Sequence, residues 1–107
     1  MSVDAIYSEF EIVTVATAIH YLNDAKENLS DGDIGNLFHH LSETYMFLRA
    51  LRVHPRAQLS QTELSALLEN GLGQAGDFWT VDITTLESTR QTLIATYPQL
   101  ADIADQL

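Results

Sequence analysis

Apolar positions recur along this chain at the three- and four-residue spacing of α-helices, and no stretch alternates cleanly at period two. Short breaks containing glycine, proline or aspartate separate the helical stretches. The pattern predicts five helical segments, which are residues 4–29, 33–54, 60–71, 82–97 and 99–107. We therefore expect an all-α fold, an antiparallel helical bundle of four to five helices that forms a single domain over residues 1–107.

The first two segments are separated by the tight turn SDGD, residues 30–33. Asp31 or Asp33 can cap the second helix by accepting hydrogen bonds from its free N–H groups. The second helix is expected to end before Pro55, because the residue before a proline is pushed away from helical angles. A break this short makes the two helices an antiparallel hairpin, on which the rest of the bundle is built.

The later segments also carry recognisable ends. The third begins at Ser60, three residues before Glu63, which is the spacing of a capping box. It ends at Gly71, a residue favoured just after a helix. Asp82 or Thr84 can cap the fourth segment.

The apolar residues of the second segment gather on one side of a helical wheel, whereas those of the first form two stripes. A helix that is apolar on two sides needs cover on two sides. Either the first segment is the central helix, covered by the third and fourth segments, or its second stripe meets another chain; we expect the former. The first stripe of the first segment is Ile6, Phe10, Val13 and Tyr21, and its second stripe is Ile12, Val15, Ala16, Ile19 and Leu22. The apolar side of the second segment is Ile34, Leu37, Phe38, Leu41, Tyr45 and Leu48, and its opposite side carries His39 and Glu43.

Charge and composition exclude several classes of partner. The chain has 15 acidic residues against 5 Lys and Arg, a net charge of −10, which repels phosphate backbones and anionic membrane surfaces. We therefore expect no nucleic-acid partner. The longest apolar run, residues 12–22, is about half as long as a membrane span. Residues 1–10 lack the basic start of a signal peptide, so we do not expect them to form one. There is no cysteine, which excludes disulfides and thiolate chemistry.

Histidine and glutamate side chains on the hairpin are the candidate chemistry. If the two helices are level across the turn, His20 lies level with residue 42, within one turn of His40 and Glu43. Imidazole nitrogens and a carboxylate oxygen are ligands that zinc or iron accepts, so His20, His40 and Glu43 are the candidate metal ligands. In the alternative interpretation, which we favour, His20 is a histidine at the edge of the core. No nucleophile elbow and no phosphate-binding loop is present, so we expect no catalytic residues, no enzyme activity and no cofactor.

Three stretches resemble an uncharacterised bacterial family, the domain of unknown function numbered 4856. They are AIHYLNDAKENLSDGD, NLFHHLSETYMFLRALR and GDFWTVDITTLESTRQTL, and they span most of residues 18–93. The resemblance is to the C-terminal part of longer, secreted or lipid-anchored envelope proteins that occur beside iron-uptake and imelysin-type genes. It implies no catalytic residue, since the family has no established activity. It leaves open whether this chain is a complete protein or a fragment. For the compartment, which the residues themselves do not fix, the resemblance implies the periplasm or cell envelope.

Two functional hypotheses follow. The first is a helical structural or protein-interaction module without catalytic activity, whose first helix binds another protein or a second copy of the chain. The alternative is a metal-binding domain, for iron or zinc, of an envelope protein associated with iron uptake.

Overall fold

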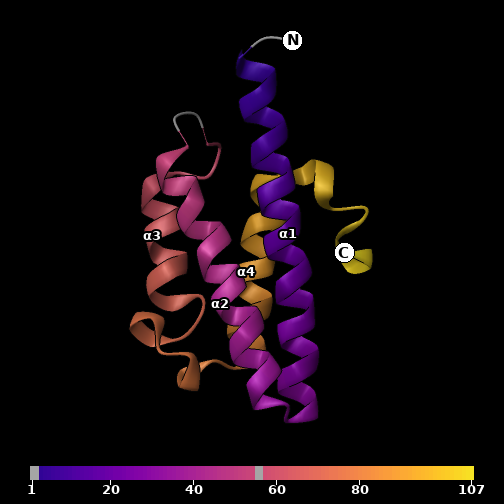
Figure 1. The fold of residues 1–107 in the computed structure, drawn as a ribbon, viewed down its shortest axis with the longest axis vertical. Helices are drawn as coiled ribbons and strands as arrows, with labels where there is room; N and C mark the ends of the chain where they lie inside the picture. The colour runs from indigo at the N-terminus through magenta and orange to yellow at the C-terminus, as the bar shows by residue number, and fades with distance from the viewer. Residues whose placement is uncertain (1–2, 55–56) are drawn as a thin grey trace.

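A computed structural model describes residues 3–54 and 57–107 of the protein. Over these ranges the chain forms four α-helices, and no β-strand is present (Figure 1). The all-α prediction is confirmed. The last predicted segment is a pair of short 3₁₀ turns instead of a helix. The α-helices are α1 (Val3–Asp31), α2 (Ile34–Ala50), α3 (Gln61–Asn70) and α4 (Ile83–Thr96); the 3₁₀ turns are η1 (Leu51–Val53), η2 (Gln74–Gly76), η3 (Phe78–Thr80), η4 (Pro98–Leu100) and η5 (Ala104–Gln106).

Helices α1 and α2 form the expected hairpin. Gly32 turns the chain at a φ of 74°, a left-handed conformation that favours glycine. Asp33 then caps α2, since its carboxylate accepts a hydrogen bond from the backbone N–H of Asn36 at 3.3 Å. Of the two capping candidates, Asp33 is therefore the one used. Pro55, the predicted limit of the second segment, lies outside the described residues.

The caps of α3 and α4 also match the sequence prediction. Ser60 Oγ accepts from the N–H of Glu63 at 3.1 Å and donates to that residue's carboxylate, which completes a capping box. Asp82 caps α4 by accepting from the N–H of Thr85 at 2.7 Å. This hydrogen bond stabilises the charged carboxylate and lowers the pKa of Asp82.

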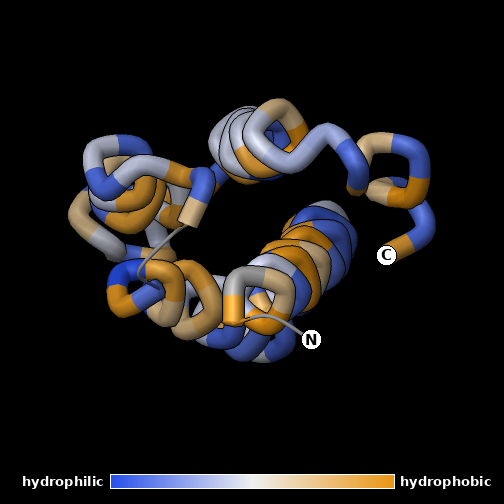
Figure 2. The backbone as a smooth tube through the Cα atoms, turned by 90° about the horizontal axis from the view of Figure 1, so that it is seen from above, coloured by the Kyte–Doolittle hydropathy of each residue, from blue (hydrophilic) through white to orange (hydrophobic). Residues whose placement is uncertain are grey.

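The core lies between all four α-helices, and α3 lies beside α2 (Figure 1). Hydrophobic residues run along the length of α1, as the view from its beginning shows (Figure 2). Leucines of α2, α3, α4 and the second half of α1 supply most of the buried volume. The fully buried large side chains are Ile19, Leu22, Leu37, Leu41, Leu48, Leu51, Leu59, Leu64, Leu72, Leu86, Leu93 and Tyr97.

The structure corrects the expectation that α1 is covered on both sides. Its stripe of Val15, Ile19 and Leu22 is buried in the core. Most of the opposite stripe is not covered, because α3 packs mainly against α2 and the loop after α3, and the elements that pack most extensively on α1 are α2, α4 and the C-terminal segment. Tyr21, at the C-terminal end of that stripe, stacks on His40 and Phe47 of α2. Ile6 and Val13, in its N-terminal part, are 53% and 65% exposed.

The C-terminal segment is fixed to α1 through a buried arginine. Arg90 on α4 is only 5% exposed, and its Nε donates to the side-chain oxygen of Asn23 at 2.7 Å. Asn23 in turn donates to the carbonyl oxygen of Ala104 at 2.8 Å. Arg90 also pairs with Asp105. These contacts hold the segment after α4 on one flank of α1 and leave the exposed stripe uncovered.

Candidate functional site

The exposed apolar stripe of α1 consists of Val3, Ile6, Phe10 and Val13. These side chains are between 53% and 65% exposed. They follow one another at spacings of three, four and three residues, so they share one face of the helix. The N-terminal part of α1 extends beyond the ends of the other helices (Figure 1), which leaves this face accessible.

A groove runs beside the stripe, between α1 and the end of α2. Ile6, Tyr7 and Phe10 line one wall, and Ala50, Val53 and His54 line the other; the groove measures about 300 Å³. Val53 is 85% exposed at its rim. This lining is almost entirely apolar, so the groove suits apolar side chains better than a polar ligand.

His54 positions the floor of the groove. Its Nε2 lies 2.9 Å from the carbonyl oxygen of Tyr7, and because that oxygen can only accept, Nε2 is the donor. The two rings meet edge to face, with centroids 5.4 Å apart. These contacts join α1 to the segment after η1. The groove is therefore preformed and does not depend on a ligand.

A buried carboxylate lies below the groove. Glu11 is 3% exposed, and its Oε2 accepts hydrogen bonds from the hydroxyl of Tyr97 and, at 2.6 Å, from the backbone N–H of Gln58. Burial raises the pKa of Tyr97 well above its ordinary value, and the hydrogen bond to Glu11 raises it further. Tyr97 is therefore a neutral hydrogen-bond donor. This cluster ties α1, α4 and the segment before α3 together.

The two candidate histidines of the hairpin meet at an aspartate. The Nε2 of His20 lies 3.4 Å from Oδ2 of Asp24, one turn along α1, and the Nε2 of His40 lies 3.9 Å from the same oxygen. The other ring nitrogen of His40, Nδ1, forms a hydrogen bond with Asn28 Oδ1 at 2.6 Å, and this bond fixes the orientation of the ring. The ring of Tyr21 stacks on it, with centroids 5.7 Å apart. The predicted hairpin register thus brings His20 and His40 to one neighbourhood.

Glu43, the third predicted ligand, is partly buried on α2 and forms no ion pair with either histidine. Asp24 was not among the predicted ligands. Within the described ranges, no group of three or more histidine, aspartate or glutamate side chains is arranged to hold a metal ion. The geometry supplies two histidines around a shared carboxylate oxygen, and the metal site itself stays a prediction.

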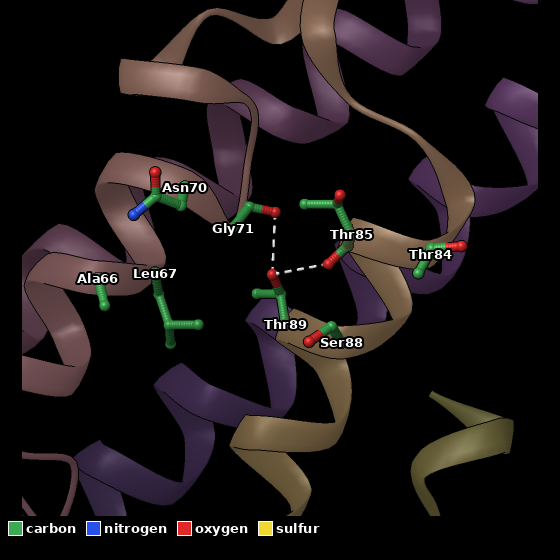
Figure 3. Close-up of a pocket in the computed structure, with 8 residues that line it drawn as sticks. All are labelled: Ala66, Leu67, Asn70, Gly71, Thr84, Thr85, Ser88 and Thr89. Carbon is green, nitrogen blue, oxygen red and sulfur yellow. Dashed lines mark hydrogen bonds between the residues drawn. The ribbon is translucent and has the colours of Figure 1, made fainter.

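A second pocket, of about 360 Å³, lies between α3 and α4. Figure 3 shows that small and hydroxyl side chains line it; one of them, Thr89, donates to the carbonyl oxygens of Gly71 at 2.9 Å and Thr85 at 3.0 Å. The helices come close together here, because a Cβ added to Gly71 would lie 2.5 Å from Thr89 Oγ1. The Thr89 hydroxyl therefore joins α4 to the end of α3.

Comparison with family models gives one result that spans the chain. The model of a domain of unknown function, DUF4856, matches residues 1–106. The chain belongs to this family. The DUF4856 match extends on both sides of the stretches at residues 18–93 that carry the resemblance in the sequence. Neither the curated proteins nor the solved structures contain a match to this DUF4856 chain.

Sequence reasoning missed three features of this DUF4856 domain. Val53 joins the exposed surface from the end of α2, and Asp24 takes the place beside the histidines that we assigned to Glu43. Glu11 was also missed, although a signal was present: on a helical wheel it falls among the core positions of α1, close to Val15.

In the described part of the chain, no helix is both long and apolar enough to cross a bilayer.

Proposed function

We propose that this DUF4856 domain is a helical protein-interaction module without catalytic activity, and that the exposed apolar stripe of α1 is its docking surface. The observation that carries the proposal is the stripe itself. Single exposed apolar residues are common, but a contiguous row of four on one helix face, beside an apolar groove, is typical of a site that binds a protein.

The spacing of the stripe indicates the kind of partner. Intervals of three and four residues are those of the a and d positions of a coiled coil, at which two helices pack knobs into holes. A helix laid along α1 would cover Ile6, Phe10 and Val13 in succession, and would reach Val53 across the groove. We infer that the partner presents a helix.

The buried polar side chains support a structural rather than a catalytic use of the interior. Glu11 and Arg90 each join segments that are distant in the sequence. In the described residues, every buried side-chain nitrogen and oxygen has a hydrogen-bond partner. The polar interior is thus engaged in holding the fold together.

Photo-crosslinking in the cells that produce the protein tests the proposal. We expect a benzophenone amino acid at position 10 to give a discrete protein adduct, because Phe10 lies in the middle of the stripe. The same substitution at Met46, which is 62% exposed on α2, serves as the matched control and should give none. Mass spectrometry of the adduct then locates the crosslinked helix. If position 10 gives no adduct, the docking surface is not used and the proposal fails.

The metal-binding alternative is separated by a second measurement. We expect zinc chloride to leave the melting temperature unchanged, because no group of three or more histidine, aspartate or glutamate side chains within residues 3–54 and 57–107 is arranged to hold a metal ion. A metal bound by the folded state alone would raise that temperature. A rise that disappears below about pH 5 and in the double variant His20→Ala, His40→Ala, but persists in His39→Ala, would establish the metal site instead.

A further inference from the structure

We propose that a cavity between α2 and α3 binds a free α-amino acid, a small zwitterion whose carboxylate and ammonium groups are both held by the protein. The cavity measures about 470 Å³, which lies in the range of small-molecule sites. Helix α3 lies beside α2 (Figure 1), and the loop after α3 contributes to the wall. The lining residues are Tyr45 of α2, Arg52 of η1, Leu68, Glu69 and Asn70 of α3, and Ala75 of η2.

Two opposite charges line this cavity without neutralising each other. Arg52 and Glu69 are both exposed, and in the described part of the chain neither of them forms an ion pair. Lys26 and Arg90, by contrast, both pair with Glu87. A molecule that lies between Arg52 and Glu69 and carries one charge of each sign would supply the two partners that the fold leaves open.

The positive side of the cavity suits a carboxylate. The guanidinium group of Arg52 is planar and presents parallel N–H donors, which match the two oxygens of a carboxylate. Arg52 extends from η1, directly after α2, so it reaches the cavity from the side opposite to α3. The carboxylate of the ligand is therefore placed at the α2 side.

The negative side of the cavity suits an ammonium group. Glu69 and Asn70 are the last two residues of α3, where the helix dipole favours a cation, and the last turn of α3 contains no basic side chain. An ammonium group donates three hydrogen bonds, for which the carboxylate of Glu69 and the side-chain oxygen of Asn70 are acceptors. A simple anion at Arg52 would gain nothing from this side. The pairing of both signs in one cavity thus selects a zwitterion.

The loop wall of the cavity is fixed by the fold. Ala75 has φ 54° and ψ 31°, a left-handed conformation that is costly for a residue with a Cβ and persists only where the surrounding structure holds it. Thr80 holds the loop, since its Oγ1 accepts from the N–H of Gln74 at 2.6 Å and donates to the carbonyl oxygen of Asp77 at 2.7 Å. The cavity therefore exists before a ligand arrives.

Titration of the ¹⁵N-labelled full chain with L-leucine, followed by NMR, tests the proposal. Leucine is the probe because Tyr45 and Leu68 supply apolar surface for its side chain. We expect saturable shifts of the amide signals of Glu69, Asn70 and Ala75, with a Kd of about 1 mM. N-acetyl-L-leucine, which has no ammonium group, and L-leucinamide, which has no carboxylate, should each bind at least about tenfold more weakly, because each leaves one charge of the cavity unpaired.

Substitutions on the protein provide the matching test. Arg52→Gln and Glu69→Gln should each raise the Kd for L-leucine about tenfold. Arg49→Gln and Glu27→Gln, at exposed positions that do not line the cavity, should leave it unchanged. All four changes are at the surface, so we expect the rest of the spectrum to keep the pattern of the natural chain.

Each outcome decides the proposal. Absence of saturable shifts up to about 20 mM L-leucine, or shifts confined to other parts of the chain, overturns the site. Equal binding of N-acetyl-L-leucine, or unchanged binding in Glu69→Gln, would mean that the cavity takes anions and overturns the zwitterion. Equal losses in the two control variants would show a general effect of charge and would also overturn it. None of the lining residues belongs to the stripe of α1, so these results leave the proposed docking surface to its own crosslinking test.

Discussion

Leu41→Ala is expected to lower the free energy of unfolding by about 2–5 kcal/mol, the range for large-to-small substitutions in a packed core. Leu41 is fully buried on the face of α2 that meets the core. Removing its side chain leaves a cavity that neighbouring leucines on three helices can fill only by moving. Urea titration followed by circular dichroism measures the change.

The matched control for this prediction is His39→Ala, two residues away on the opposite face of the same helix. His39 is exposed, so we expect a change below about 0.5 kcal/mol. Equal losses from the two substitutions would mean that the assignment of the core and solvent faces of α2 is wrong.

Glu11→Ala is the second substitution with a large expected effect, a loss of about 3–5 kcal/mol in the free energy of unfolding. The buried carboxylate accepts hydrogen bonds from the Tyr97 hydroxyl and the Gln58 N–H. Hydrogen bonds to a charged group contribute about 1.5–3 kcal/mol each, and both donors would be left without an acceptor in the interior. Glu9→Ala, at an exposed position of the same helix, should cost less than about 0.5 kcal/mol.

The same cluster has a pH signature on the alkaline side. Burial, followed by the hydrogen bond to Glu11, raises the pKa of Tyr97 in the folded protein. The stability that Tyr97 supplies is therefore fully present below its ordinary value of 10.0, and is lost as the pH rises above it. We expect the unfolding free energy of the natural chain to fall more steeply above pH 10 than that of Tyr97→Phe. Equal slopes would show that Tyr97 ionises in the fold as it does in the unfolded chain.

The beginnings of α2, α3 and α4 followed from the sequence by itself, whereas α2 ends at Ala50, before the predicted end at residue 54. Asp33, Ser60 with Glu63, and Asp82 cap the helices that they were expected to cap. These signals are dependable because a cap acts over three residues and needs no distant partner. The one-sided face of α2 was equally accessible, since a stripe at helical spacing has to be buried.

It could also be predicted which residues of α1 lie beside which residues of α2, because the tight turn between them fixes how the two helices align. His20 and His40 do lie in one neighbourhood. The choice of carboxylate could not be predicted, since it depends on the rotation of each helix about its own axis. That rotation is set by packing, and it brings Asp24 rather than Glu43 to the histidines.

Only the tertiary structure decided which stripe of α1 is buried. The sequence showed two apolar stripes of similar strength, and local rules give no means to choose between them. The choice depends on where α3 packs, and α3 packs on α2. It also depends on Arg90, which holds the C-terminal segment on one flank of α1. The exposed surface on which the proposed function rests is therefore a consequence of long-range packing, which a pattern along the chain does not encode residue by residue.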